Sequence, residues 1–141
     1  MLEIQLVDYT KARGTIHEIR HQVFTLEQHV DSELDFDGQD ENAFQVIAYA
    51  DNKPAGTGRM LSDGHIGRIA VLGGFRKLGA GTLIVNTLVE LARERKLSRV
   101  FLGAQVLAMP FYEKLGFTTY GETYMEAGIM HMPMEIDLET P

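Results

Sequence analysis

The segment Ile69-Ala70-Val71-Leu72-Gly73-Gly74-Phe75-Arg76-Lys77-Leu78-Gly79-Ala80-Gly81-Thr82 decides the fold, because the hydrophobic period of the chain changes within it. Residues 66–72 read as an apolar strand, and residues 79–96 carry a single helical stripe of apolar side chains. A strand, a glycine-containing loop and a long helix therefore follow one another. The first N–H groups of such a helix lack internal partners and the helix dipole adds positive potential, so this turn is suited to an anion.

The composition of the loop suits an anion, and its spacing excludes the usual rival motifs. Glycines at positions 79 and 81 let a ligand approach the backbone closely, and Arg76 and Lys77 add formal charge. No Gly-Lys-Ser/Thr sequence closes a Walker-type loop, and the first strand carries no dinucleotide fingerprint. We therefore expect this turn to be a ready site for an anion.

The rest of the chain supplies one domain around this turn. Strands are expected over residues 2–6, 43–50, 56–61, 66–72, 99–105, 117–124 and 130–138, and helices over 14–28, 79–96 and 109–115. This order predicts a single α/β (α+β) domain over residues 1–141, with a mixed twisted sheet of about six to seven strands flanked by helices. Pro133 cannot donate to a ladder, so a local break is expected in the last strand.

Composition and charge narrow the functional classes. The 141 residues are 45% hydrophobic and 23% charged, which fits one soluble domain, and they include no cysteine. No apolar run approaches the roughly 20 residues that cross a bilayer, and the N-terminus does not resemble a signal peptide, so we expect a cytoplasmic protein without a membrane partner. The formal net charge of −7 shows no basic face, so we expect no nucleic-acid partner.

The acidic groups are concentrated in one segment. Residues 27–41 hold seven carboxylates and no lysine or arginine: Glu27, Asp31, Glu33, Asp35, Asp37, Asp40 and Glu41. This segment is either a solvated loop or a rim that attracts a cationic substrate.

Two motifs resemble those of a known enzyme family. The pattern R-x-x-G-x-G from Arg76 to Gly81 resembles the acyl-CoA pyrophosphate motif of GNAT N-acetyltransferases, and the sequence FYEKLGF at residues 111–117 resembles their C-terminal motif. A narrower resemblance is to the small bacterial ElaA-like branch. It rests on VFTLEQ at residues 23–28, DFDG at 35–38, LGAQ at 102–105 and AGIMH at 127–131.

The resemblance implies an acyltransferase that uses acetyl-CoA and no metal. The sheet would splay between the strand before Arg76 and the strand that ends at Gln105, and the donor would lie in that splay. Its pantetheine arm would be held by the backbone of Ile69, Ala70 and Val71 and by Gln105. Its pyrophosphate would be held by the amides of Arg76, Lys77, Leu78, Gly79, Ala80, Gly81 and Thr82. The acceptor would be a small-molecule or peptide amine, and homodimers are common in the family.

The resemblance also implies catalytic roles. Tyr112 matches the proton donor to the departing thiolate, and a phenol with a pKa of about 10 can protonate a thiolate without being ionised at neutral pH. Many family members have a glutamate base where this chain has Gly67. Glu27 and His131 are our candidates for that base, and Phe24, Glu27, Gln28 and His131 are the residues expected on the acceptor side.

Two alternatives stay open at this level. A catalytically silent acyl-CoA-binding sensor or partner module is favoured by Gly67 and opposed by Tyr112. A zinc peptidase would use His17, Glu18 and His21, which match H-E-x-x-H. On the helical wheel both histidines point away from the buried side, so we expect no metal site there.

Overall fold

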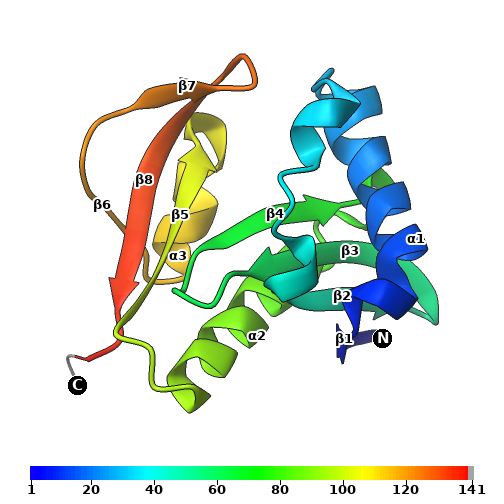
Figure 1. Cartoon of the computed structure of the whole chain (residues 1–141), viewed down its shortest axis with the longest axis horizontal. Helices are drawn as coiled ribbons and strands as arrows, with labels where there is room; N and C mark the ends of the chain where they lie inside the picture. The colour runs from blue at the N-terminus through cyan, green and yellow to red at the C-terminus, as the bar shows by residue number, and fades with distance from the viewer. Residues whose placement is uncertain (140–141) are drawn as a thin grey trace.

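The computed structural model describes residues 1–139, in which eight strands form two antiparallel sheets (Figure 1). The first sheet has the order β1 (Leu2–Val7), β2 (Phe44–Ala50), β3 (Lys53–Met60), β4 (Ile66–Val71). In the second, β8 (Ile129–Asp137) pairs with β5 (Arg99–Gln105), β6 (Thr118–Thr119) and β7 (Tyr124–Glu126). The α/β fold class is confirmed, and so is the splay between the strand before Arg76 and the strand that ends at Gln105, because β4 and β5 separate; within residues 1–139 the strands number eight and form two sheets of four.

The two sheets meet at one end only. A parallel bridge joins His65 to Phe101, where the N–H of Phe101 donates to the carbonyl of Gly64 at 3.1 Å. Gly64 has φ +96°, and a Cβ there would lie 2.3 Å from the carbonyl oxygen of Arg99, so only glycine allows this approach. Beyond the bridge the strands diverge (Figure 1), and in residues 1–139 the outer edge of β4 pairs with no further strand.

A β-bulge interrupts β4 beside the point of divergence. Thr57 pairs with Ala70 and Arg59 pairs with Gly67, so two residues of β4, Arg68 and Ile69, oppose one residue of β3. Arg68 takes a left-handed backbone conformation with φ 51°, which is uncommon for a residue with a side chain. Bulges of this kind bend a strand and re-aim its side chains.

The long helices cover opposite faces of the first sheet. α1 (Tyr9–Arg20) packs Ile16 against Ile47, whereas α2 (Ala80–Glu94) packs Ile84 and Leu88 into the cluster that contains Val46. The alternation of side chains along β2 thus separates the two layers. No helix within residues 1–139 is long and apolar enough to span a bilayer.

The start expected for the first helix, residue 14, is wrong. The helix begins at Tyr9, because the Asp8 side chain caps it by accepting from the N–H of Thr10 at 2.9 Å. Residues 10–14 carry few apolar side chains, so hydrophobic periodicity could not detect this first turn. The helix continues as the π-helix η1 (His21–Glu27), which bears Phe24 and ends beside the divergence of β4 and β5.

The expected break at Pro133 is confirmed on one side of β8. On the β5 side the pairing runs without interruption from Gln105–His131 to Arg99–Asp137. On the other side, β6 and β7 are separate strands, and the N–H of Tyr120 between them donates to the Pro133 carbonyl at 3.0 Å. Since the nitrogen and oxygen of an extended residue face the same side, the missing N–H of Pro133 faces this gap. The strand expected over residues 117–124 is therefore two short strands.

The remaining elements are short. α3 (Met109–Lys114) ends before Gly116, which has φ +100°. Four 3-10 turns connect the larger elements: η2 (Ser32–Asp35), η3 (Asp40–Asn42), η4 (Gly73–Phe75) and η5 (Val106–Ala108). Three of them, η2, η4 and η5, lie next to the divergence of the two sheets and contribute residues to the site described below.

Candidate active site

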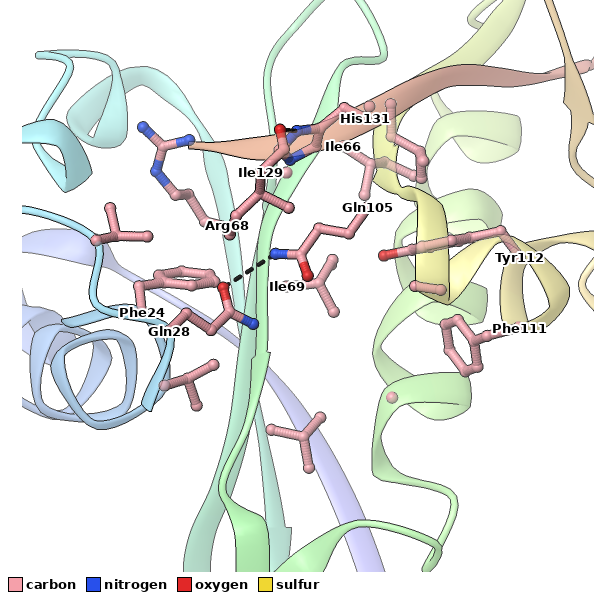
Figure 2. A pocket seen from close by; sticks show the side chains of 18 of the residues that line it. Phe24, Gln28, Ile66, Arg68, Ile69, Gln105, Phe111, Tyr112, Ile129 and His131 are labelled. Carbon is pink, nitrogen blue, oxygen red and sulfur yellow. Dashed lines mark hydrogen bonds between the residues drawn. The ribbon is translucent and has the colours of Figure 1, made fainter. Parts of the chain in front are cut away.

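A cleft of about 930 Å³ opens where β4 and β5 diverge. Its walls come from η1, β4, the turn before α2, β5, α3 and the β7–β8 hairpin, and Figure 2 shows side chains from these walls directed into it. Most residues singled out from the sequence line this cleft: Phe24, Glu27, Gln28, Ile69, Val71, Arg76, Lys77, Gly79, Ala80, Gly81, Thr82, Gln105, Tyr112 and His131. The fold thus gathers segments that lie more than 100 residues apart in the sequence.

Two of the residues expected to contact the cofactor do not line the cleft. Ala70 is 2% exposed and packs with Ile19 and Val23, because strand alternation turns it to the α1 face. Leu78 is 56% exposed and projects from the turn before α2. The backbone of these residues still belongs to the loop and strand, but their side chains have no role in the cleft.

The N-terminus of α2 forms one end of the cleft. Gly79 is its N-cap with φ 91°, and among residues 1–139 no side chain caps the helix. The first intrahelical bond runs from the N–H of Leu83 to the carbonyl of Gly79 at 3.0 Å, so the preceding amides of the first turn have no helical acceptors. Ala80, Gly81 and Thr82 line the cleft at this turn.

Gly81 has a second role that the sequence did not reveal. A Cβ at this position would lie 3.3 Å from Cζ of Phe111, which is tighter than most side-chain contacts. A bulky residue at Gly81 would therefore displace α3 as well as any ligand. Gly73 and Gly74, by contrast, have open space around them.

The Arg76 side chain forms hydrogen bonds with two other residues, Glu27 and Val71. Its Nη1 and Nη2 donate to the two carboxylate oxygens of Glu27 at 2.5 and 2.6 Å, and its Nε donates to the Val71 carbonyl at 3.0 Å. The hydrogen bond from Arg76 lowers the pKa of Glu27, which makes that carboxylate a weaker base. Arg76 and Glu27 therefore join the loop before α2 to the end of η1.

Tyr112 projects from α3 into the cleft (Figure 2). The side chain is 9% exposed, its ring packs edge-on against Phe111 and Phe117, and its hydroxyl has no hydrogen-bond partner within residues 1–139. Burial raises the pKa of the phenol to about 12, above the ordinary value on which the sequence argument relied. The phenol therefore keeps its proton at neutral pH.

His131 lies on β8, where it pairs with Gln105 of β5, and it lines the same cleft. Its Nδ1 lies 2.7 Å from the carbonyl oxygen of Ile129, and its ring stacks on Tyr124 at 5.5 Å between centroids. Since a carbonyl can only accept, Nδ1 carries the proton, and in the neutral imidazole Nε2 holds the lone pair. Among residues 1–139 no group hydrogen-bonds to Nε2.

A hydrogen bond crosses the cleft between its two walls. Nε2 of Gln105, at the end of β5, donates to Oε1 of Gln28, just after η1, at 3.0 Å (Figure 2). Gln105 and Gln28, assigned separately to the cofactor and acceptor sides, are thus direct partners. The pair joins the second sheet to the helical segment that bears Phe24.

The acidic segment is largely neutralised by arginines. Asp40 accepts from Arg20 at 2.8 and 3.0 Å and from Arg59 at 2.9 Å, and Arg59 also donates to both oxygens of Asp37. The hydrogen bonds from Arg59 lower the pKa of Asp37 to about 2. Burial alone would raise the pKa of Asp40, but the two arginines hold it well below its usual range. The expectation of either a solvated loop or a rim that attracts a cationic substrate is therefore wrong for Asp37 and Asp40.

Arg68 and Tyr124 line the cleft although sequence reasoning did not assign them a role. Arg68 reaches the cleft through the bulge, which the sequence pattern of β4 does not reveal. Tyr124 lies over Gly103, where a Cβ would come within 1.8 Å of the phenol oxygen. A glycine in the middle of an apolar strand was the available signal that another group approaches there.

The two histidines of the H-E-x-x-H match, His17 and His21, lie in different surroundings. His17 shares a hydrogen bond with the Tyr9 hydroxyl and packs on Phe36 with 4.6 Å between ring centroids. It is therefore partly buried, although the helical wheel places it away from the side of Ile16, Ile19 and Val23. Burial lowers its pKa, whereas His21 is exposed. Within residues 1–139, no group of three or more His, Cys, Asp or Glu side chains is arranged to hold a metal ion.

Comparison with known proteins agrees with this geometry. Residues 7–138 match the family model described as the acetyltransferase (GNAT) domain. The chain is 39% identical over 128 residues to YyaT of Bacillus subtilis (84% of this chain, 86% of that one), and 35% identical over 123 residues to the B. subtilis protein named "uncharacterized N-acetyltransferase YjcF" (84% and 88%). The crystal structure of Escherichia coli ElaA superposes with a TM-score of 0.84 at 24% identity, covering 96% of this chain and 99% of that one. The resemblance found in the sequence is confirmed: this chain belongs to the GNAT acetyltransferase family.

Proposed function

We propose that this enzyme transfers an acetyl group from acetyl-CoA to an amine by direct attack. The observation that carries the proposal is that one cleft contains an unpaired strand edge on β4, the uncapped N-terminus of α2 and the buried phenol of Tyr112. An extended pantetheine arm needs backbone partners such as the β4 edge offers, and a pyrophosphate needs free amides such as those of the first turn of α2. The residues present therefore fit the donor.

Acetyl-CoA supplies an activated acetyl thioester, and the protein supplies positioning and proton transfer. Nε2 of His131 takes the proton that the amine loses as its nitrogen bonds to the acetyl carbon. The contact of Nδ1 with the Ile129 carbonyl supports this role, because it fixes the tautomer that leaves Nε2 basic. Glu27 is a weaker candidate for the base, since Arg76 occupies both of its oxygens.

Tyr112 gives its proton to the sulfur as the carbon–sulfur bond breaks, so the products are an N-acetylated amine and the CoA thiol. The raised pKa of Tyr112 makes the phenol a weaker acid than in water. Burial in the same cleft also raises the pKa of a thiol, so acid and leaving group shift in the same direction. His131 and Tyr112 regain their starting protonation from solvent after the products leave.

The test is a thiol-release assay with acetyl-CoA and a broad panel of amines, with acetylated products identified by mass spectrometry. We expect release that depends on the amine, and a rise in melting temperature with CoA, because a ligand that binds only the native state stabilises it. A melting temperature unchanged at millimolar CoA would reject donor binding. Binding without transfer to any amine would instead support the silent acyl-CoA-binding module, for which the missing side chain at Gly67 is the argument.

A further inference from the structure

The charges around the acceptor side of the cleft differ from those that the acidic sequence suggests. Of the seven carboxylates in residues 27–41, only Glu27 and Asp35 line the cleft. Glu27 is paired with Arg76, and Asp35 is 8% exposed and lies beside Arg68 and Arg20. The acidic segment therefore places no row of free carboxylates in the cleft, and Glu126 of the β7–β8 hairpin is the further carboxylate among the described residues that line it.

In the cluster of Arg20, Arg59 and Arg68, Arg68 lines the cleft and its side chain is 25% exposed, whereas Arg20 and Arg59 do not line it. The donors of Arg68 make only long contacts: Nε lies 3.3 Å from both the backbone carbonyl and Oδ1 of Asp35, and Nη2 lies 3.4 Å from the Leu34 carbonyl and 3.5 Å from Oδ2 of Asp37. Its Nη1 has no hydrogen-bond acceptor within residues 1–139. Arg20 and Arg59, in the same cluster, bond carboxylates at 2.8 to 3.0 Å.

The pKa shifts of Arg68 and Arg59 also differ in direction. Burial and the neighbouring Arg59 lower the pKa of Arg68, against the opposing effects of Asp37 and Asp35. For Arg59, the hydrogen bonds that it donates to Asp37 and Asp40 outweigh burial and raise its pKa. A partly buried guanidinium with a spare donor is stabilised by a further anion, and a carboxylate matches its fork geometry.

The backbone also directs Arg68 to the cleft. Its left-handed conformation at the bulge is of the uncommon kind that occurs at functional sites. The guanidinium side chain is 25% exposed and lines the cleft, and Figure 2 shows it in the same region as His131. The surrounding wall is apolar and includes Phe24, Leu34 and Ile129.

We propose that Arg68 binds the carboxylate of the acceptor, so that the acceptor is a free α-amino acid with an apolar side chain. In such a molecule the carboxylate and the reacting amine are attached to one carbon, so binding to Arg68 brings the amine toward Nε2 of His131. Phe24, Leu34 and Ile129 receive the apolar side chain. The net charge of −7 does not prevent this, because screening limits the effect of distant charges to about 8–10 Å at physiological salt. This inference rests on the proposed acetyl transfer.

The test compares acceptors that differ only by the carboxylate. Initial rates are measured with saturating acetyl-CoA for phenylalanine against phenethylamine and for leucine against isopentylamine. We expect kcat/KM to be at least about tenfold higher for each amino acid, as the loss of one charge-assisted contact implies. Arg68→Gln should reduce that ratio to about one, mainly by raising the KM of the amino acid, and Arg68→Lys should restore it only in part.

The outcomes separate this inference from the proposed function. If the wild-type protein has an equal or higher kcat/KM for the decarboxylated amines, the inference is overturned while acetyl transfer stands. Activity confined to amines without a carboxylate would have the same consequence. If none of the amines in the panel causes release of thiol, the proposed function would instead be rejected. The wild-type comparison does not depend on how well an Arg68 variant folds, and CoA affinity measured by calorimetry checks the fold of each variant.

Discussion

Glu27 and Arg76, 49 residues apart, form a bidentate ion pair in which both carboxylate oxygens accept from the guanidinium at 2.5 and 2.6 Å. Glu27 was a candidate base and Arg76 a candidate phosphate ligand, and each is the partner of the other. The pair connects the helical segment with Phe24 and Gln28 to the loop before α2. We interpret both residues as positioning groups that link the acceptor and donor halves of the cleft.

Glu27→Gln should therefore affect donor binding more than the chemical step. Both side chains are more than 40% exposed, and exposed ion pairs contribute only about 0–1 kcal/mol. We expect the Kd for CoA to rise by about two- to fivefold and kcat to change by less than about threefold. Calorimetry and steady-state kinetics measure the two effects, with the exposed Glu33→Gln as control. A loss of kcat of a hundredfold or more, at unchanged CoA affinity, would identify Glu27 as the base after all.

His131→Gln removes the basic nitrogen while keeping a polar side chain of similar reach. If Nε2 takes the proton of the amine, kcat should fall by about 10²- to 10⁴-fold, with little change in the affinity for CoA. His21→Gln, an exposed histidine outside the cleft, is the control and should behave like the wild type. Similar turnover in the His131 variant and the wild type would exclude His131 as the base.

Tyr112→Phe keeps the ring packed between Phe111 and Phe117 but removes the proton. Since the hydroxyl has no partner within residues 1–139, its loss should leave the melting temperature nearly unchanged. Turnover should fall by about ten- to a thousandfold, and kcat and kcat/KM should fall together, because the proton is given only in the transition state. A variant with wild-type kcat on a verified acceptor would show that Tyr112 has a packing role alone.

The pH profile of kcat gives an independent test of the same group. Burial raises the pKa of Tyr112 to about 12, so the acid form is lost only as the pH rises toward that value. A phenol with its ordinary pKa of about 10 would already be half ionised at pH 10, and kcat would decline between about pH 9 and 10. We expect no such decline up to about pH 10 in stopped assays with a saturating acceptor. A fall centred at or below about pH 10 would contradict the buried, proton-bearing phenol.

Asp40 supports the fold rather than the chemistry, although it lies in the segment that first suggested a substrate rim. Arg20 is fully buried and depends on Asp40, so Asp40→Asn should lower the free energy of unfolding by about 3–5 kcal/mol. Urea denaturation at pH 7 measures this loss, and the exposed neighbour Glu41→Gln should change stability by less than about 0.5 kcal/mol.

The same cluster predicts the acid sensitivity of the wild-type protein. The pKa values of Asp37 and Asp40 are depressed in the folded state, to about 2 for Asp37. Their contribution to stability is present above the unfolded pKa of about 4 and is lost as the pH falls from there through the folded values. Wild-type stability should therefore decrease between about pH 4 and 2, and Asp40→Asn should show a smaller decrease. An equal decrease in both proteins would show that the cluster does not control acid unfolding.

The sequence by itself determined the strand, the turn and the helix at residues 69–82, the single domain and the position of Tyr112. These features are local: the change of period at residues 69–82, the glycines of the turn and the motif at residues 111–117 can each be read within one segment. Even the break opposite Pro133 followed from a local property, the missing N–H.

Only the tertiary structure decided which groups meet in the cleft. The pairing of Glu27 with Arg76, the neutralisation of Asp40 by Arg20 and the proton position on His131 all depend on contacts that periodicity does not encode. The bulge that turns Arg68 into the cleft depends on the register between β3 and β4, which a shift of one residue would change. Burial of these charged groups is tolerated only with partners, and the partners come from distant segments that the fold brings together.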